Sequence, residues 1–206
     1  MDFSLERRYL SRGFQLVGGV DEVGRGAVAG PLFVGLTIFF KLEDDLIFWT
    51  DSKQIYSQRR REEIFMKLLS LDCLVWSVGW VDAFEIDRNG IVWALGEALR
   101  RAIAKLPDQS VPSILLTDGK FPFPGIEIPQ RPIVKGDALS PSIAAASIIA
   151  KVIRDIYVAS IEGLKPYGVL AHKGYATKLH QSKIKELGLS SWHRKTFLKK
   201  FLKEGE

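Results

Sequence analysis

Cysteine is almost missing from this chain of 206 residues, which contains one, Cys73. A single cysteine excludes an internal disulfide, and without cysteine or histidine clusters at zinc-ligand spacing we expect no zinc site. Leu71, Leu74 and Val75 are its sequence neighbours. We therefore expect a buried, reduced thiol, which is typical of a reducing compartment.

Long apolar runs are missing as well. The longest stretch without a charged residue is residues 26–40, which contains Pro31. These 15 residues are too few to cross a bilayer, which takes about 20. The first residues include charged side chains at positions 2, 6, 7 and 8, unlike a signal peptide. We expect a cytoplasmic protein that does not bind membranes.

The remaining composition is that of a globular protein, with 47% hydrophobic and 26% charged residues. Its charge is uneven, because residues 165–206 hold 10 Lys and Arg against 3 Asp and Glu, whereas residues 1–164 hold 19 against 21. We predict a single domain with a core at 1–164 and a basic helical segment at 165–206 packed on it. The basic segment indicates either a polyanionic partner or a solvated helical surface.

The hydrophobic patterns predict an α/β fold with a mixed five-stranded sheet flanked by helices. Strands are expected at 14–23, 31–40, 71–80, 113–117 and 131–135. Helices are expected at 57–70, at 82–105 with a break near Asn89–Gly90, and at 138–161, 177–187 and 192–203. A short glycine-rich link predicts an antiparallel hairpin of the first two strands, and Ser57 is a suitable N-cap.

Three of these strands end in carboxylates: Asp21 and Glu22 at the first, Asp118 at the fourth and Asp137 at the fifth. If the strands are neighbours, the four carboxylates lie together, and a divalent cation with oxygen ligands would stabilise them. Side chains alternate along a strand, so Glu22 needs either a bulge or a long reach around the strand end to join Asp21. Taken one at a time, each carboxylate is more typical of a turn or cap residue, but together at the ends of several apolar strands they favour a metal site.

The glycines after the first strand do not indicate a nucleotide-binding loop. Asp21 and Glu22 would repel a pyrophosphate, Pro31 begins another strand instead of a helix, and no G-K-S or G-K-T sequence occurs. Elsewhere, Lys151 and Asp155 have the spacing of a helical ion pair. The stretch His172–Tyr175 suits either a sugar–phosphate backbone or an ordinary loop.

Six stretches, in the same order along the chain, resemble ribonuclease HII, the type 2 ribonuclease H. They are G-V-D-E-V-G-R-G-A-V-A-G-P (19–31), D-S-K-Q (51–54), T-D-G-K (117–120), K-G-D-A-L-S-P-S-I-A-A-A-S-I-I-A-K-V-I-R-D (135–155), H-K-G-Y-A-T-K-L-H (172–180) and H-R-K-T-F (193–197). The resemblance implies a ribonuclease H-like fold and a metal-dependent endoribonuclease. Its substrates would be the RNA strand of RNA–DNA hybrids and single ribonucleotides in duplex DNA, incised on their 5′ side.

The resemblance also implies site residues. Asp21, Glu22, Asp118 and Asp137 would be the catalytic ligands of two Mg²⁺ or Mn²⁺ ions, and the products would carry 3′-hydroxyl and 5′-phosphate ends. The remaining positions would bind substrate: Gly24, Arg25 and Gly26 at the ribonucleotide 2′-hydroxyl, Tyr175 on the sugar at the ribo-to-deoxy junction, and Lys53, Ser147, His172 and Lys173 near backbone phosphates.

Three alternatives remain at this point. Ribonuclease HIII carries another residue at the Arg25 position and an extra N-terminal domain, for which we expect no room before Asp21. A non-catalytic nucleic-acid-binding module would tolerate loss of Asp21 and of metal. A metal-dependent phosphatase would need neither the basic segment nor Tyr175. We expect a monomer, and no protein partner is evident from the sequence.

Overall fold

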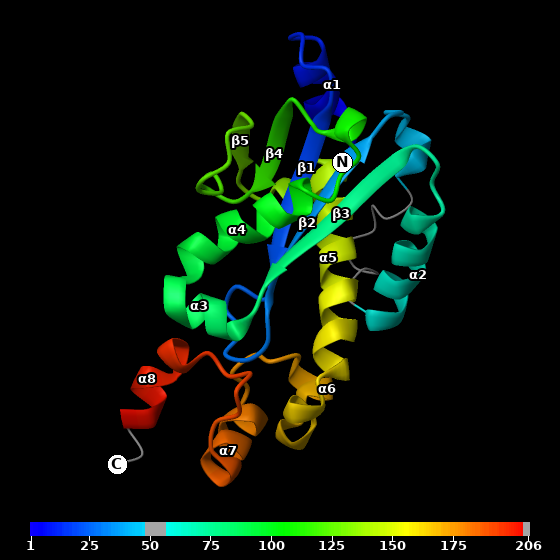
Figure 1. The fold of residues 1–206 in the computed structure, drawn as a ribbon. Coiled ribbons are helices and arrows are strands. Elements are labelled where there is room, and N and C mark those ends of the chain that lie inside the picture. Colours follow the sequence, from blue (N-terminus) through cyan, green and yellow to red (C-terminus); the bar gives the residue numbers. More distant parts are fainter. Residues whose placement is uncertain (48–56, 204–206) are drawn as a thin grey trace.

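The fold is built on one mixed β-sheet. A computed structural model describes residues 1–47 and 57–203 (Figure 1). The strands are β1 (Val17–Val23), β2 (Leu32–Phe39), β3 (Leu74–Val81), β4 (Ile114–Asp118) and β5 (Gln130–Ile133), in the order β3-β2-β1-β4-β5. β1 pairs antiparallel with β2, and β2 with β3, whereas β1–β4 and β4–β5 are parallel. The predicted five-stranded mixed sheet and its hairpin are therefore confirmed.

Helices surround the sheet and extend past one end of it. They are α1 (Ser4–Leu10), α2 (Gln58–Leu69), α3 (Ala83–Asn89), α4 (Ile91–Ile103), α5 (Pro141–Ser160), α6 (Val169–His172), α7 (Lys178–Leu187) and α8 (Lys195–Lys203). The Ser57 side chain accepts from the Arg60 amide at 3.1 Å, which confirms the predicted N-cap. The predicted break falls at Gly90, whose φ of +85° ends α3. The hydrophobic patterns did not predict α1 and α6, because these helices have 7 and 4 residues and are too short to show a helical period.

Two helices pack on opposite faces of the sheet. α5 packs closely on one face, because Cβ atoms added at Gly19 and Gly35 would lie 2.2 Å and 2.4 Å from α5 backbone atoms. On the other face Val20 and Leu36 share a buried cluster with residues of α4. Because side chains alternate along β1, Asp21 faces α5 and Glu22 faces the α4 side.

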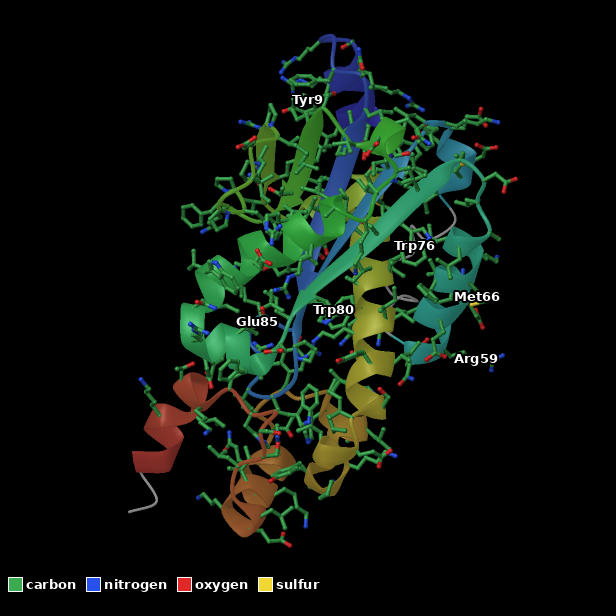
Figure 2. The ribbon with its side chains drawn as sticks, viewed as in Figure 1. Tyr9, Arg59, Met66, Trp76, Trp80 and Glu85 are labelled. Carbon is green, nitrogen blue, oxygen red and sulfur yellow. The ribbon has the colours of Figure 1, made fainter. Side chains whose placement is uncertain are left out.

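The edge strand β3 packs on α4 through Ser77 and Gly79 and carries two large aromatic side chains. Trp76 and Trp80 project from it (Figure 2), and Trp80 stacks on Phe33 with ring centroids 5.8 Å apart. The free Cys73 lies in the turn before β3 and is partly exposed, so the predicted burial of this thiol is wrong. Its apolar neighbours belong to the strand and the preceding helix end, whereas the turn itself faces solvent.

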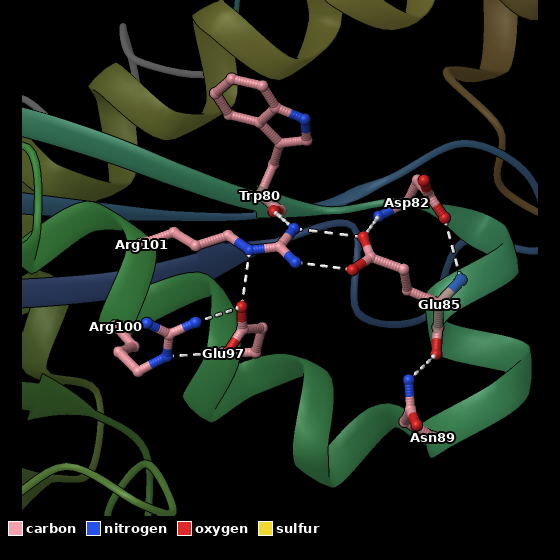
Figure 3. Close-up of polar contacts among 7 residues, drawn as sticks. All are labelled: Trp80, Asp82, Glu85, Asn89, Glu97, Arg100 and Arg101. Carbon is pink, nitrogen blue, oxygen red and sulfur yellow. Dashed lines mark hydrogen bonds and ion pairs between the residues drawn. The ribbon is translucent and has the colours of Figure 1, made fainter.

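An arginine network joins β3, α3 and α4 (Figure 3). Arg101 donates to both carboxylate oxygens of Glu85, at 2.6 and 3.1 Å, to Glu97 at 2.7 Å and to the Trp80 carbonyl at 2.8 Å. The fork of the guanidinium matches the Glu85 carboxylate, and this geometry holds α3 against the end of β3.

The C-terminal helices pack beyond the end of β1, next to the β1–β2 connection (Figure 1). The Val28 and Ala29 amides both donate to the Gly174 carbonyl, and the Gly30 amide donates to the Trp192 carbonyl. In the part of the chain that the structure describes, no helix is both long and apolar enough to cross a membrane.

Candidate active site

The strand ends that carry the predicted carboxylates meet at one edge of the sheet. β1 and β4 run parallel with Val20 opposite Thr117, so Asp21 and Asp118 come next on adjacent strands. β5 lies on the far side of β4, and Asp137 follows it in a short 3₁₀ turn. The three strands are therefore neighbours in the sheet, as predicted.

Asp21 is the buried member of this group, with 9% of its surface exposed. Burial raises the pKa of Asp21 to about 7; a hydrogen bond with Ser147 of α5 opposes the rise, and the charges of Glu22 and Asp118 add to it. The Asp21 carboxylate also accepts the Glu22 amide at 2.8 Å. The close packing of α5 on the sheet thus gives Asp21 a fixed position and an unfavourable negative charge.

Glu22 lies on the other face of β1. The strand register is continuous, with Asp21 opposite Gly35 and Glu22 opposite Val34, so the predicted alternative of a bulge is wrong. The Glu22 side chain accepts a hydrogen bond from Arg25 at 3.3 Å. Together with Asp118 it lines a hollow whose other residues are Arg25, Val92, Leu95, Gly119, Lys120, Phe121, Pro122, Phe123 and Pro124.

Asp118 holds the turn that carries Asp137. Its Oδ1 accepts the Gly136 amide at 2.7 Å. Asp137, the next residue, is exposed. The fourth carboxylate is thus tethered to the third through the backbone, with its own side chain open to solvent.

The donor set of this edge fits a hard divalent cation by its chemistry, because it offers carboxylate oxygens only. The buried charge of Asp21 beside two further carboxylates is the electrostatic situation that such a cation relieves. Within residues 1–47 and 57–203, no three His, Cys, Asp or Glu side chains converge closely enough to hold a metal ion. The carboxylates are gathered at one edge, but they are not arranged as a finished metal centre.

A tight turn follows the Asp21–Glu22 pair. Gly24 has a φ of +83°, and a Cβ on it would lie 2.1 Å from Nε of Arg154, so no other residue fits there. Arg25 and Gly26 are exposed, and a Cβ on Gly26 would meet nothing within 4 Å. The backbone of this turn is thereby open to a ligand beside the carboxylates.

Tyr175 is half-buried and lies among cations. Its ring centroid is 5.4 Å from the Arg154 guanidinium carbon and 5.8 Å from the Lys151 ammonium. The predicted ion pair of Lys151 with Asp155 is confirmed at 2.9 Å. The neighbouring Lys173 is partly exposed, in the left-handed conformation with a φ of 49°.

Three other predicted substrate residues differ in their surroundings. Ser147 lies beside Asp21. The ring of His172 is buried, with Nε2 facing the Tyr167 carbonyl at 2.9 Å and Nδ1 accepting the Gly174 amide at 3.2 Å, so neither nitrogen is free for a phosphate. Lys53 lies outside the described residues.

Sequence reasoning missed two residues that shape this region, Arg154 and Arg194. Both are fully buried. They occur inside two of the matched stretches, 135–155 and 193–197, which was the available signal. Arginine in a charged stretch is more typical of an exposed surface, so their burial could not be inferred.

Comparison with known proteins decides the family. The family model for ribonuclease HII matches residues 18–202. The chain belongs to the ribonuclease HII family. Ribonuclease HII of Clostridioides difficile is 41% identical over 198 residues, which cover 96% of this chain and 75% of that protein. Membership makes the chain a ribonuclease H, a hydrolytic nuclease, and it favours ribonuclease HII over the ribonuclease HIII alternative.

Solved structures agree with this assignment of ribonuclease HII. The crystal structure of ribonuclease H2 from Pyrococcus horikoshii superposes with a TM-score of 0.71 at 29% identity, covering 92% of this chain and 98% of that one. Ribonuclease HII from Archaeoglobus fulgidus, solved in a complex with PCNA, gives a TM-score of 0.69 at 28% identity, covering 87% of this chain and 94% of that one. The ribonuclease H-like fold is thus shared across nearly the whole chain.

Proposed function

We propose that this ribonuclease HII cleaves the RNA strand of RNA–DNA hybrids and incises duplex DNA on the 5′ side of a single embedded ribonucleotide. One observation carries the finer part of the proposal: the Gly24–Arg25–Gly26 turn begins two residues after Glu22, at the end of the strand that carries Asp21 and Glu22. A backbone that approaches the sugar beside the metal ligands is suited to detect the 2′-hydroxyl, the group that distinguishes RNA from DNA.

Tyr175 supplies the second half of this recognition. Its aromatic ring would pack on the sugar next to the ribonucleotide, where the strand changes from ribose to deoxyribose. The backbone pairing of Gly174 with Val28 and Ala29 supports this role, because it fixes the segment of Tyr175 against the turn. Arg25 and Tyr175 thus belong to two elements that are joined through backbone hydrogen bonds.

Asp21, Glu22, Asp118 and Asp137 would hold Mg²⁺ or Mn²⁺, with two ions in the reactive complex. The cations would supply an activated water and charge stabilisation of the leaving 3′ oxygen, so that the products carry 3′-hydroxyl and 5′-phosphate ends. The Glu22 amide donates to the Asp21 carboxylate, with Ser147 beside it on the α5 side, and Asp118 accepts the Gly136 amide next to Asp137. These two contacts keep the ligands at the sheet edge before any ion arrives.

The basic segment 165–206 would contact backbone phosphates, as would Lys173 and Ser147 near the turn. Such contacts make binding salt-dependent, because each neutralised phosphate releases counterions. We propose a core at 1–164 with this segment attached as one domain, acting as a cytoplasmic monomer.

The decisive experiment uses a DNA duplex with one ribonucleotide in a labelled strand. Incubation with Mg²⁺ or Mn²⁺ is expected to give one shorter strand ending in a 3′-hydroxyl immediately before the ribonucleotide, and chelation should stop the reaction. A uniform RNA–DNA hybrid serves as the second substrate. An uncut single-ribonucleotide strand beside a cleaved hybrid would reject the finer proposal, and binding without cleavage of either would favour the non-catalytic module.

A further inference from the structure

Two buried arginines lie next to the Gly24–Arg25–Gly26 turn, and neither has the carboxylate partner that a buried arginine usually has. Arg154 of α5 and Arg194, just before α8, are both fully buried. Among the described residues neither is paired with a carboxylate, and each has one buried Nη2 atom without a hydrogen-bond partner. Burying a charge that has no carboxylate partner costs several kcal/mol. What offsets this cost must come from the groups that the two arginines do bind.

The acceptors of the two guanidinium groups are carbonyl oxygens of the elements proposed to read the ribonucleotide. Arg194 donates to the Arg25 carbonyl at 3.1 Å and to the Gly30 carbonyl at 3.0 Å, which joins the two ends of the β1–β2 connection. Arg154 donates to the Pro31 carbonyl at 2.9 Å and to the Lys173 carbonyl at 3.0 Å. One arginine thus closes the turn, and the other ties it to the segment that leads to Tyr175.

Guanidinium geometry makes these contacts rigid. The donors lie in one plane at fixed angles, so two carbonyls bound by one arginine are held at a fixed separation. Gly24 takes part, because only its missing Cβ leaves space for the Arg154 side chain. The Arg154 guanidinium also lies 5.4 Å from the Tyr175 ring.

We infer that Arg154 and Arg194 are positioning residues that set the placement of the Gly24–Arg25–Gly26 backbone relative to Tyr175, and that the preference for a ribonucleotide junction depends on them although they touch no substrate. The inference rests on the proposed function. The enzyme can bind and cleave a uniform hybrid at many positions along the RNA strand, whereas a single ribonucleotide allows only one position. A small displacement of the turn should therefore harm junction incision more than hybrid cleavage.

The test compares kcat/KM on the single-ribonucleotide duplex with kcat/KM on the uniform hybrid, for wild type, Arg154→Lys and Arg194→Lys. Lysine keeps a positive charge but cannot bind two carbonyls in one plane, so the ratio should fall by on the order of tenfold or more. Arg100→Lys is the matched control, since Arg100 is exposed and pairs only with Glu97 among the described side chains. It should keep the wild-type ratio.

Hydrogen exchange supplies a readout that does not depend on activity. The amides of Val28, Ala29 and Gly30 should exchange faster in both lysine variants, while those of β1 and β2 stay protected. If one variant does not fold, the other carries the test, because both arginines bind the same connection. A ratio that stays at the wild-type value, or an equal loss on both substrates, would overturn the inference. Failure of the wild type to cut the single-ribonucleotide duplex would instead reject the proposed function.

Discussion

The Nε2 atoms of His180 and His193 lie 3.1 Å apart in the interior of the C-terminal segment. Nδ1 of His193 accepts the Ser190 amide at 3.0 Å, so its proton is on Nε2. Nδ1 of His180 faces the Tyr175 carbonyl at 2.9 Å, which requires a proton there and leaves its Nε2 as the acceptor. The two rings are therefore a neutral donor–acceptor pair that contacts the backbone of Tyr175.

Acid is expected to destabilise this pair. Burial lowers the pKa of His180, and burial together with the nearby His180 lowers the pKa of His193 to about 4. Below the unfolded pKa of about 6.5, the unfolded chain binds protons that the folded pair excludes, so stability falls as the pH drops from about 6.5 toward 4. For His193 the loss approaches about 1.4 kcal/mol per pH unit within this window.

Urea unfolding of the wild type and of His193→Gln, near neutral pH and near pH 5, measures this contribution. The variant should be less stable at neutral pH and should lose less stability on acidification. Because all other groups, His180 included, are shared, the difference between the two slopes isolates the contribution of His193. Equal slopes would mean that these histidines are not held neutral by the fold.

Arg101 is expected to matter for stability, in contrast to its sequence neighbour. Arg101→Ala removes a paired contact with Glu85 and the hydrogen bond to Trp80 (Figure 3), and we expect a loss of about 1–2 kcal/mol in the free energy of unfolding. Arg100→Ala removes an exposed guanidinium from Glu97, which keeps its pair with Arg101, and should cost at most about 0.5 kcal/mol. Equal losses in chemical unfolding would contradict the role of the network.

Asp87 of α3 caps α8 from a different part of the chain. Its carboxylate accepts the Lys195 amide at 2.6 Å and the Thr196 amide at 3.0 Å, the first two residues of that helix. Asp87→Ala should therefore cost about 1 kcal/mol, as loss of an N-cap does. Amides of α8 should exchange faster, and substrate binding should weaken at moderate salt. Glu162→Gln, in an exposed ion pair, is the control; loosening of α8 in that variant would show a general effect of lost charge.

Asp21→Asn should separate stability from activity. A carboxyl whose pKa is raised is destabilising above its unfolded pKa of about 4, and the penalty is complete above about 7. Metal-free Asp21→Asn should thus be more stable than wild type by about 1–3 kcal/mol near pH 8, with the gain vanishing as the pH falls toward 4. Cleavage and the metal-induced rise in Tm should both be lost. A variant that keeps either of these would remove Asp21 from the metal site.

The sequence patterns located the strands that carry Asp21 and Asp118 because both strands are buried and apolar. Neighbouring parallel strands end at the same edge of a sheet, so the proximity of Asp21 and Asp118 could be predicted from the strand patterns. Alternation of side chains along β1 also predicts that Asp21 and Glu22 face opposite sides of the sheet, and the continuous register of β1 with β2 shows that no bulge changes this. The burial of Arg154 and Arg194 did not follow, since it arises from contacts between segments more than 100 residues apart in sequence. Partial exposure of Cys73 reflects the turn in which it lies, a feature that its apolar neighbours conceal.

Tyr175 should affect the choice of substrate while leaving the metal ligands intact. Tyr175→Ala removes the ring that we propose packs on the sugar, and stacking on an aromatic side chain is worth about 1–3 kcal/mol, so incision at a single ribonucleotide should fall roughly tenfold to a hundredfold. Tyr175→Phe keeps the ring and should retain most of the rate. Both variants should keep the wild-type rise in Tm on adding Mn²⁺, because Tyr175 is not among the four carboxylates that we propose hold the metal. If alanine leaves the junction rate unchanged while phenylalanine does the same, the ring does not contribute to recognition, and the preference must come from the Gly24–Arg25–Gly26 backbone alone.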